Sequence, residues 1–260
     1  MHHTAHTEMP AADRAAARLP QQPARQPQAE ARLRQPRKKR RVFPRTFEER
    51  LDIGLPVLRV PATWEEYLEL ADTADYRVQY REGHIISFLE IEETTNGTIM
   101  GEASIPHETL VGRFITQLSL LLDEPESDVL VMGSNLKLFL PEAHRGVNPD
   151  VTVVKGEPVV QEYVGKKRKS KGLTNPWLVV EILSNSTRDF DLSEKLNDYK
   201  QIPSLQQIIF AEQGSVWAST YIRLGDREWQ NLDFDNLDDT IPLADSEARI
   251  PLRKIFARMF

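Results

Sequence analysis

Residues 177–183 have the sequence Trp-Leu-Val-Val-Glu-Ile-Leu, an apolar stretch in which Glu181 is the only charged side chain. Asn175-Pro176 precedes this stretch and Ser184-Asn185 follows it, and its length and β-branched residues predict a buried strand. Burial of a lone ionised carboxylate costs much free energy unless the group is paired or binds a metal ion. Glu181 is therefore the first candidate for a functional side chain.

A second acid lies in a second predicted strand, residues 148–154, with the sequence Asn-Pro-Asp-Val-Thr-Val-Val. Strand alternation places Asp150 on its more polar face, and it places Glu181 on the same face as Val179 and Leu183. If the strands are neighbours, the two carboxylates lie side by side and repel each other unless a cation separates them. Oxygen ligands of this kind suit Mg²⁺ or Mn²⁺. An alternative is structural, with Asp150 capping a turn.

A basic residue follows on a predicted helix. Asp191 and Glu194 have capping-box spacing, which predicts that a helix begins at Asp191 and that Asp191 serves mainly as its cap. Lys195 then lies just past the first turn, with Tyr199 as its i+4 neighbour. If the helix leans back over the Glu181 strand, Lys195 reaches the acids and orients water or stabilises charge on a phosphate. A purely structural Glu181–Lys195 pair is the alternative.

The rest of the pattern indicates an α+β fold. Thr63 and Glu66 form a capping box for a short helix, and residues 77–91 read as a hairpin with a Glu82-Gly83 turn. The spacing of apolar residues predicts a long helix over 107–122. Strands and helices mix without strict alternation, which favours one domain with a mixed central β-sheet flanked by α-helices.

Charge divides the chain unevenly. Residues 1–45 contain 11 Arg or Lys and 3 Asp or Glu, whereas the remainder contains 22 and 36. We expect residues 1–50 to be a disordered basic N-terminal extension and residues 55–260 to be the folded domain. The extension is either a basic arm that touches nucleic acid or a solvated, dispensable segment.

Composition excludes several classes of protein. The chain has no cysteine, so we expect no disulfides, no thiolate metal site and a reducing, cytoplasmic location. Its apolar runs are too short to span a membrane, and no apolar segment near the N-terminus suggests a secretory signal. The acidic body does not resemble a general nucleic-acid binder, so any such contact is expected to be local.

One loop is a candidate for local contact with phosphates. Five of the six residues 166–171 are basic, namely Lys166, Lys167, Arg168, Lys169 and Lys171. The loop precedes the Glu181 strand and is either a phosphate-binding loop beside the site or an ordinary solvated loop.

The ordered series of motifs resembles a known family. The series comprises Pro149-Asp150, Glu181-Ile-Leu-Ser184, Asp191-x-x-x-Lys195-x-x-x-Tyr199 and residues 202–205, Ile-Pro-Ser-Leu. Upstream, residues 64–68, residues 80–83 and His107 also look like the Uma-two family of restriction endonucleases, part of the PD-(D/E)XK nuclease superfamily. The similarity covers roughly residues 60–255.

The resemblance implies a restriction-endonuclease-like fold in which Asp150 and Glu181 bind metal and Lys195 is catalytic. The wider superfamily has Lys two residues after the strand Glu, but Leu183 stands there in this chain. The Uma-two family instead takes its Lys from the following helix, which matches Lys195. Possible accessory residues are His107, Glu82, Glu108 and Tyr199, and for each a purely structural role is the alternative.

These observations lead to two main hypotheses, and a metal-dependent enzyme that acts on another phosphoester is a third interpretation. In the first, the protein is a Mg²⁺-dependent endonuclease that hydrolyses DNA phosphodiester bonds, and a homodimer would suit cleavage of both strands. In the second, it is a catalytically weak or inactive nuclease-fold module that binds nucleic acid or a protein partner. Leu183 favours the second hypothesis, and the joint presence of Asp150, Glu181 and Lys195 favours the first.

Overall fold

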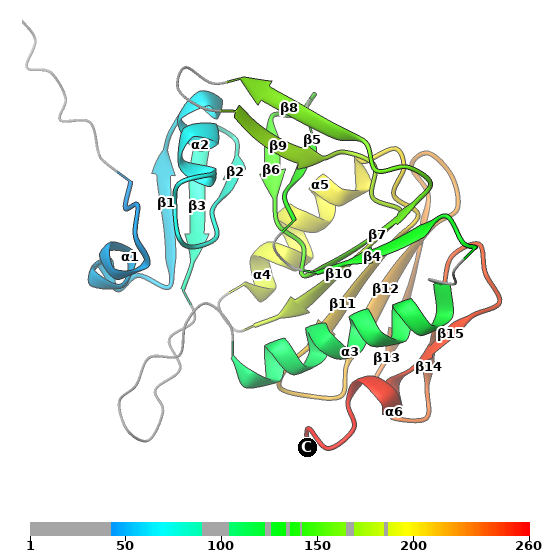
Figure 1. Ribbon diagram of the computed structural model, residues 1–260. Helices are drawn as coiled ribbons and strands as arrows, with labels where there is room; N and C mark the ends of the chain where they lie inside the picture. Colours follow the sequence, from blue (N-terminus) through cyan, green and yellow to red (C-terminus); the bar gives the residue numbers. More distant parts are fainter. Residues whose placement is uncertain are drawn as a thin grey trace, which may run out of the picture. The chain divides into compact units, whose positions relative to one another are not determined.

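The apolar stretch with the single glutamate forms β10 (Leu178–Leu183), a strand whose residues are all buried. The computed structural model describes residues 43–89, 104–122, 126–133, 136–140, 142–164, 169–184 and 187–260. All of them belong to one compact unit. β10 lies inside a six-stranded sheet of order β13-β12-β11-β10-β7-β4 (Figure 1).

The other strands of this sheet are β4 (Val129–Met132), β7 (Val151–Lys155), β11 (Gln207–Glu212), β12 (Ala218–Arg223) and β13 (Trp229–Phe234). β10 runs parallel to β11 and antiparallel to β7, so the sheet is mixed. This sheet and its covering helices confirm the predicted α+β class with a mixed sheet flanked by helices.

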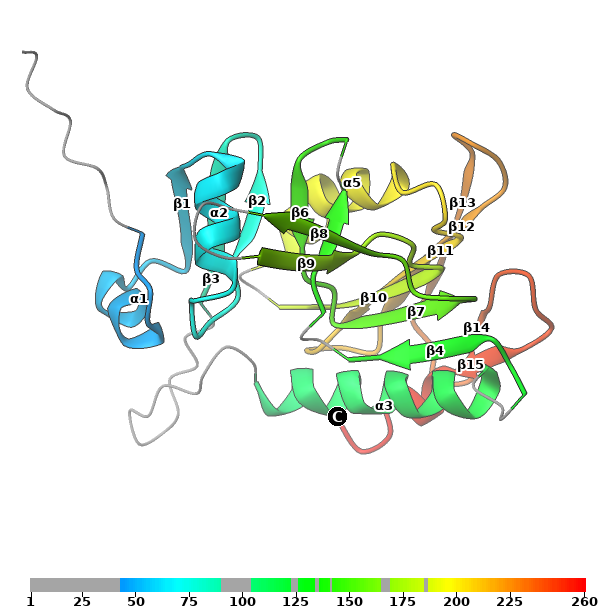
Figure 2. The same cartoon turned by 45° about the horizontal axis from the view of Figure 1, so that its top comes forward.

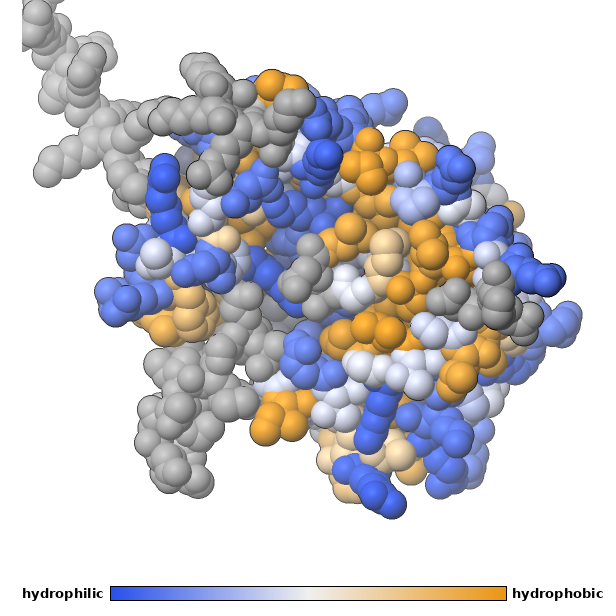
Figure 3. Space-filling model, viewed as in Figure 1, coloured by the Kyte–Doolittle hydropathy of each residue, from blue (hydrophilic) through white to orange (hydrophobic). Residues whose placement is uncertain are grey.

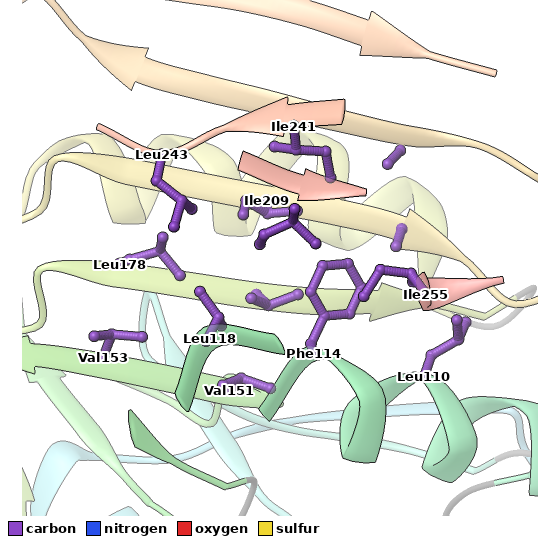
Figure 4. Close-up of a cluster of buried hydrophobic side chains, with 14 of the residues drawn as sticks. Leu110, Phe114, Leu118, Val151, Val153, Leu178, Ile209, Ile241, Leu243 and Ile255 are labelled. Atoms are coloured by element: carbon purple, nitrogen blue, oxygen red, sulfur yellow. The ribbon is translucent and has the colours of Figure 1, made fainter. Parts of the chain in front are cut away.

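One face of the sheet is covered by α3 (Ile105–Leu122), which runs along it in both ribbon views (Figure 2). Leu110, Phe114 and Leu118 of α3 point into an apolar cluster with Val151 and Leu178 (Figure 4). The C-terminal elements β14 (Thr240–Pro242), β15 (Arg249–Pro251) and α6 (Leu252–Ile255) also contribute to this cluster. The helix predicted over 107–122 therefore exists and begins two residues earlier.

The opposite face packs against a helical segment made of α4 (Arg188–Phe190), the π-helical turn η1 (Asp191–Lys195) and α5 (Leu196–Lys200). Val179 and Leu183 share an apolar cluster with Leu196 and Tyr199 on this side. The strand alternation predicted for residues 177–183 is thus confirmed for 179 and 183. Glu181, between them, faces the helical segment.

The start predicted for this helix is wrong. The helical segment begins at Arg188, whose N–H donates to the Ser184 carbonyl at 2.9 Å. Asp191 has helical dihedrals of −65° and −47°, and its N–H donates to the Thr187 carbonyl at 2.8 Å. Asp191 therefore lies inside the helical segment, and its side chain is available for contacts other than capping.

A second, seven-stranded sheet has the order β1-β3-β2-β6-β5-β9-β8. Its strands are β1 (Val57–Pro61), β2 (Gln79–Arg81), β3 (His84–Phe88), β5 (Leu138–Leu140), β6 (Arg145–Val147), β8 (Val160–Val164) and β9 (Lys169–Leu173). The β2–β3 turn is Glu82-Gly83, as predicted, and positive φ at both residues gives it the type I′ form that suits hairpins.

α2 (Trp64–Ala71) covers this sheet and begins with the predicted Thr63–Glu66 capping box. Its Trp64 and Tyr67 pack with Tyr80 in an aromatic cluster. Gly146 of β6 lies directly against Tyr67, because a Cβ at this position would be 2.3 Å from the tyrosine oxygen. The sequence therefore needs glycine here for close packing rather than for an unusual turn.

The folded part starts earlier than predicted. α1 (Phe47–Ile53) has its own capping box from Thr46 and Glu49, and Phe43 is buried. Arg50 is completely buried and donates hydrogen bonds to Ser87 Oγ at 2.7 Å and to the Leu55 carbonyl at 2.6 Å. Residues 43–54 thus belong to the fold, and the predicted boundaries at 50 and 55 are corrected. Residues 1–42 lie outside the described residues.

Within the described part of the chain, no helix is both long and apolar enough to cross a bilayer. Hydrophobic side chains on the face shown in Figure 3 gather over the region of β4, β7 and β8, and hydrophilic ones gather on the side of α1 and β3. Leu130 of β4 and Val160 of β8 are among the exposed hydrophobic residues.

Candidate active site at the end of strand β10

The two predicted metal-binding acids lie on neighbouring strands. In the β7–β10 ladder Val151 pairs with Val180, so Asp150, which directly precedes β7, comes next to Glu181. The Asp150 N–H donates to the Val180 carbonyl at 3.1 Å, and its carboxylate accepts a 2.9 Å hydrogen bond from the N–H of Ile182. Asp150 is 4% exposed and Glu181 is 2% exposed. The ladder thus places two buried carboxylates at one end of the sheet.

Lys195 reaches these acids from the π-helical turn. Its Nζ lies 2.6 Å from Glu181 Oε1 and 3.4 Å from Asp191 Oδ1. The Tyr199 hydroxyl donates to the same Glu181 oxygen. Asp191, Lys195 and Tyr199 thus lie on one side of the segment, and π-helical turns of this kind occur often at functional sites.

Asp150 has two further partners from distant parts of the chain. Arg77 Nη1 lies 3.0 Å from Asp150 Oδ1, and His107 Nε2 lies 3.2 Å from Oδ2. His107 belongs to the first turn of α3, where its N–H donates to Ser104 Oγ at 3.2 Å. The N-terminal end of α3 therefore brings the His107 imidazole to the Asp150 carboxylate.

These side chains border one cavity of about 70 Å³, which has room for about two water molecules. Its charged lining consists of Arg77, His107, Asp150, Glu181, Asp191 and Lys195. The phenyl ring of Phe88 also borders the cavity and packs against Phe190, with ring centroids 5.0 Å apart. The site is thus small, polar at its base and partly aromatic at its side.

The pKa of each acid follows from its surroundings. Burial raises the pKa of Glu181 to about 8 and also raises the pKa of Asp191. For Asp150, burial acts in the same direction, but the hydrogen bond and charge of His107, together with Arg77 and Lys195, hold its pKa below the usual range. Asp150 is therefore the firmly ionised member of the group.

The pKa of Lys195 is coupled to that of Glu181. Burial alone would lower the pKa of Lys195, but the carboxylates of Asp191, Glu181 and Asp150 raise it above its ordinary value. Because three acids face one ammonium, Lys195 is cationic, and burial leaves about one proton shared between Glu181 and Asp191 at pH 7.

The donor set fits a hydrated divalent cation. Among the described residues, no three His, Asp or Glu side chains form a ready metal-binding group. Asp150 and Glu181 nevertheless present carboxylate oxygens to one cavity that has room for water. Mg²⁺ is commonly held by one or two carboxylates, with water and substrate phosphates as its other ligands. These two residues would hold such an ion.

The other predicted site residues have different surroundings. Glu82 is more than half exposed in the β2–β3 turn and pairs with Arg145, away from the cavity lining. Glu108 is also exposed and lies 3.5 Å from the second ring nitrogen of His107. Leu183, at the position where the superfamily has Lys, is buried in the apolar cluster beside Tyr199. The lysine at Glu181 comes from the helical segment instead.

The predicted phosphate-binding loop is only partly described. Lys166, Lys167 and Arg168 lie outside the described residues, and Lys169 begins β9. Lys171 is exposed and pairs with Glu162 of β8 at 3.6 Å, and it is not part of the cavity lining.

Sequence reasoning missed two members of the site. Arg77 precedes a short strand, and no local pattern links it to Asp150, which lies 73 residues later. Asp191 was interpreted mainly as a helix cap, although its spacing of four residues from Lys195 was the available signal for a contact.

Residues 64–250 match the protein family described as Uma2, putative restriction endonuclease. The uncharacterized protein sll1609 of Synechocystis sp. is 28% identical over 167 residues, covering 64% of this chain and 84% of that protein. The uncharacterized protein slr1290 of the same organism is 29% identical over 175 residues, covering 67% and 80%. The fold is similar to the crystal structure of a putative nuclease belonging to DUF820 from Anabaena variabilis, with a TM-score of 0.57 and 17% identity, covering 77% of this chain and all of that one.

Proposed function

This chain belongs to the Uma2 family of putative restriction endonucleases, and on that premise we propose that it is a divalent-metal-dependent endonuclease that hydrolyses DNA phosphodiester bonds. The family description supports nuclease function in general. One observation supports the specific proposal, namely that Asp150, Glu181 and Lys195 meet at a single buried cavity. Two acids and a lysine in such a place suit metal-assisted phosphodiester hydrolysis.

In this proposal Asp150 and Glu181 hold Mg²⁺ or Mn²⁺. The ion would lower the pKa of a bound water and neutralise charge on the scissile phosphate. Lys195 supplies an ammonium that orients the attacking water or stabilises the charge that develops on the phosphate. His107 and Arg77 keep the Asp150 carboxylate oriented through contacts of 3.2 and 3.0 Å. Arg77 is also one-third exposed, so a substrate phosphate could reach its guanidinium.

The partners follow from the same proposal. DNA would approach the site with its backbone, and the basic stretch at residues 37–41 and the basic loop at 166–171 would add phosphate contacts. A homodimer would present two such sites to the two strands of a duplex. Replacing the basic loop residues should then weaken DNA binding and flatten its salt dependence.

A second candidate is a nuclease-fold module that binds nucleic acid or a protein partner without efficient catalysis. Two observations favour it. The usual lysine position holds the buried Leu183, and Lys195 is engaged by two carboxylates. A protein of this kind would bind DNA in a salt-dependent way and leave it intact.

Plasmid cleavage separates the two candidates. The purified full chain is incubated with supercoiled plasmid and Mg²⁺ or Mn²⁺, beside Glu181→Gln and the matched control Glu82→Gln. We expect nicking by the wild type and by Glu82→Gln, and none by Glu181→Gln. Equal activity in all three would indicate a contaminating nuclease. No cleavage by any of them, with DNA binding retained, would support the binding module.

A further inference from the structure

The ammonium of Lys195 has two acidic partners in the same buried place. It lies 2.6 Å from Glu181 Oε1 and 3.4 Å from Asp191 Oδ1. None of the three side chains is more than 4% exposed. Two carboxylates thus compete for one cation, and in this arrangement Glu181 has the closer contact.

A divalent cation on Glu181 would change this balance. The metal and the ammonium would then share one carboxylate, and two positive charges at such range repel strongly in a buried site. Lys195 has to draw away from Glu181, but a buried ammonium without an acidic partner is strongly unfavourable. The site therefore needs a second carboxylate that can receive Lys195.

Asp191 is suited to this role, and the other acids of the helical segment are not. It stands four residues before Lys195 and is already within ion-pair distance. Asp189 is exposed, Glu194 is directed to Arg81 at 2.9 Å, and Asp198 is directed to Arg145 at 3.2 Å. A small movement of the flexible lysine side chain is enough to exchange Glu181 for Asp191.

We propose that Asp191 is a positioning residue that receives the Lys195 ammonium when a divalent metal ion binds Glu181, and that Lys195 is the internal counter-ion of Glu181 in the metal-free protein. This inference rests on the metal site of the proposed function. In this inference Asp191 influences metal binding through its contact with Lys195, and it is not itself a metal ligand. Lys195 is thereby retained in the site, beside the bound metal, in position to act on the phosphate.

Metal affinity tests the inference without a cleavage assay. Calorimetric titration with Mn²⁺ is performed on the full-length wild type, Asp191→Asn, Lys195→Met and the double variant. Asp189→Asn serves as the matched control, because it removes an exposed acid from the same helical segment. Mg²⁺-dependent thermal stabilisation of each protein provides a second measurement.

The expected results differ in sign. Lys195→Met should bind Mn²⁺ with an affinity at least about tenfold higher than the wild type, because the substitution removes the ammonium that competes with the metal for Glu181. Asp191→Asn should bind about tenfold more weakly, because this variant lacks the carboxylate that receives the ammonium when Lys195 leaves Glu181. In the double variant the effect of Asp191→Asn should vanish, so that it binds like Lys195→Met. Asp189→Asn should match the wild type.

Three results would overturn the inference. A loss of affinity by Asp191→Asn that persists in the Lys195→Met background would make Asp191 a metal ligand. Unchanged affinity in Lys195→Met would show that the lysine does not compete with the metal. No Mn²⁺ binding by the wild type would remove the metal site of the proposed function, and this inference with it. If Lys195→Met does not fold, Lys195→Gln supplies a neutral side chain with a polar end for the same cycle.

Discussion

The carboxylate of Asp150 and the backbone N–H of Ile182 are joined by a 2.9 Å hydrogen bond across strands β7 and β10. Ile182 is the residue after Glu181, so this bond fixes the position of one site acid relative to the other. The same carboxylate contacts Arg77 and His107. Asp150 therefore has two roles, because its carboxylate stabilises the fold and also forms part of the candidate site. Protonation of this carboxylate in acid should therefore lower the stability of the protein.

We predict that Asp150→Asn reduces the acid sensitivity of the metal-free protein. Because the folded-state pKa of Asp150 lies below its usual value of 3.8, its contribution to stability is complete above that value and is lost as the pH falls through the folded-state pKa. At pH 7 the variant should be less stable by about 1–3 kcal/mol, and this difference should shrink below about pH 4. Urea unfolding at several pH values measures it. The exposed Asp238→Asn is the control, and a pH-independent difference would contradict the prediction.

Glu181 predicts a proton release on metal binding. Burial raises its pKa to about 8 and raises that of Asp191 as well, so the two acids share about one proton at pH 7 in the metal-free protein, and this proton must leave for both to ionise on metal binding. Binding of Mn²⁺ at pH 7 should therefore release about one proton, and the affinity should rise with pH until about pH 8 and then level off. Calorimetry in buffers of different ionisation enthalpy counts the protons. A pH-independent affinity would show that the site is ionised before the metal arrives.

A group of ion pairs connects the second sheet to the helical segment that carries Lys195. Asp198 of α5 is 1% exposed at its side chain and contacts Arg145 of β6 at 3.2 Å and Arg81 of β2 at 3.6 Å. Glu194 adds a 2.9 Å contact to Arg81. These ion pairs hold the helical segment against the second sheet.

We therefore predict that Asp198→Ala destabilises the fold by about 3–5 kcal/mol, because two guanidinium groups lose a buried partner. The exposed pair Arg253–Asp238 is the matched comparison, and Asp238→Ala should cost about 1 kcal/mol or less. Chemical denaturation of the two variants provides the measurement. Losses of similar size would show that the buried ion pairs contribute no more than surface ones.

Strand alternation and helical spacing predicted which side chains of the candidate site share a face, because both signals act locally. Alternation in a strand placed Glu181 on the face of Val179 and Leu183, and the acid-bearing segments turned out to be neighbours. Lys195 was predicted because the helix that follows the Glu181 strand carries Asp191, Lys195 and Tyr199 at a spacing of four residues, and this helix can fold back over the strand. In each case the signal lies within a few residues of the functional group.

The remaining features depend on contacts that no local pattern encodes. Arg77 meets Asp150 across 73 residues, and the second sheet contains strands of three residues, too short for a clear period. The Asp191–Glu194 spacing imitates a helix start, but hydrogen bonds accepted by the Ser184 and Thr187 carbonyls begin the helix earlier. Arg50 looked like part of a basic, solvated region, although the fold buries it.

Arg50 provides the last prediction, which concerns the start of the folded domain. Its guanidinium is fully buried and donates to Ser87 Oγ and to the carbonyls of Leu55 and Pro56, which joins α1 to β1 and β3. Replacing Arg50 by Ala leaves these acceptors without donors and opens a cavity, so we expect a loss of about 2–4 kcal/mol. Arg45→Ala, at an exposed position before α1, should change stability by less than about 0.5 kcal/mol. Urea unfolding measures both, and an unaffected Arg50→Ala variant would place the start of the stable domain after α1.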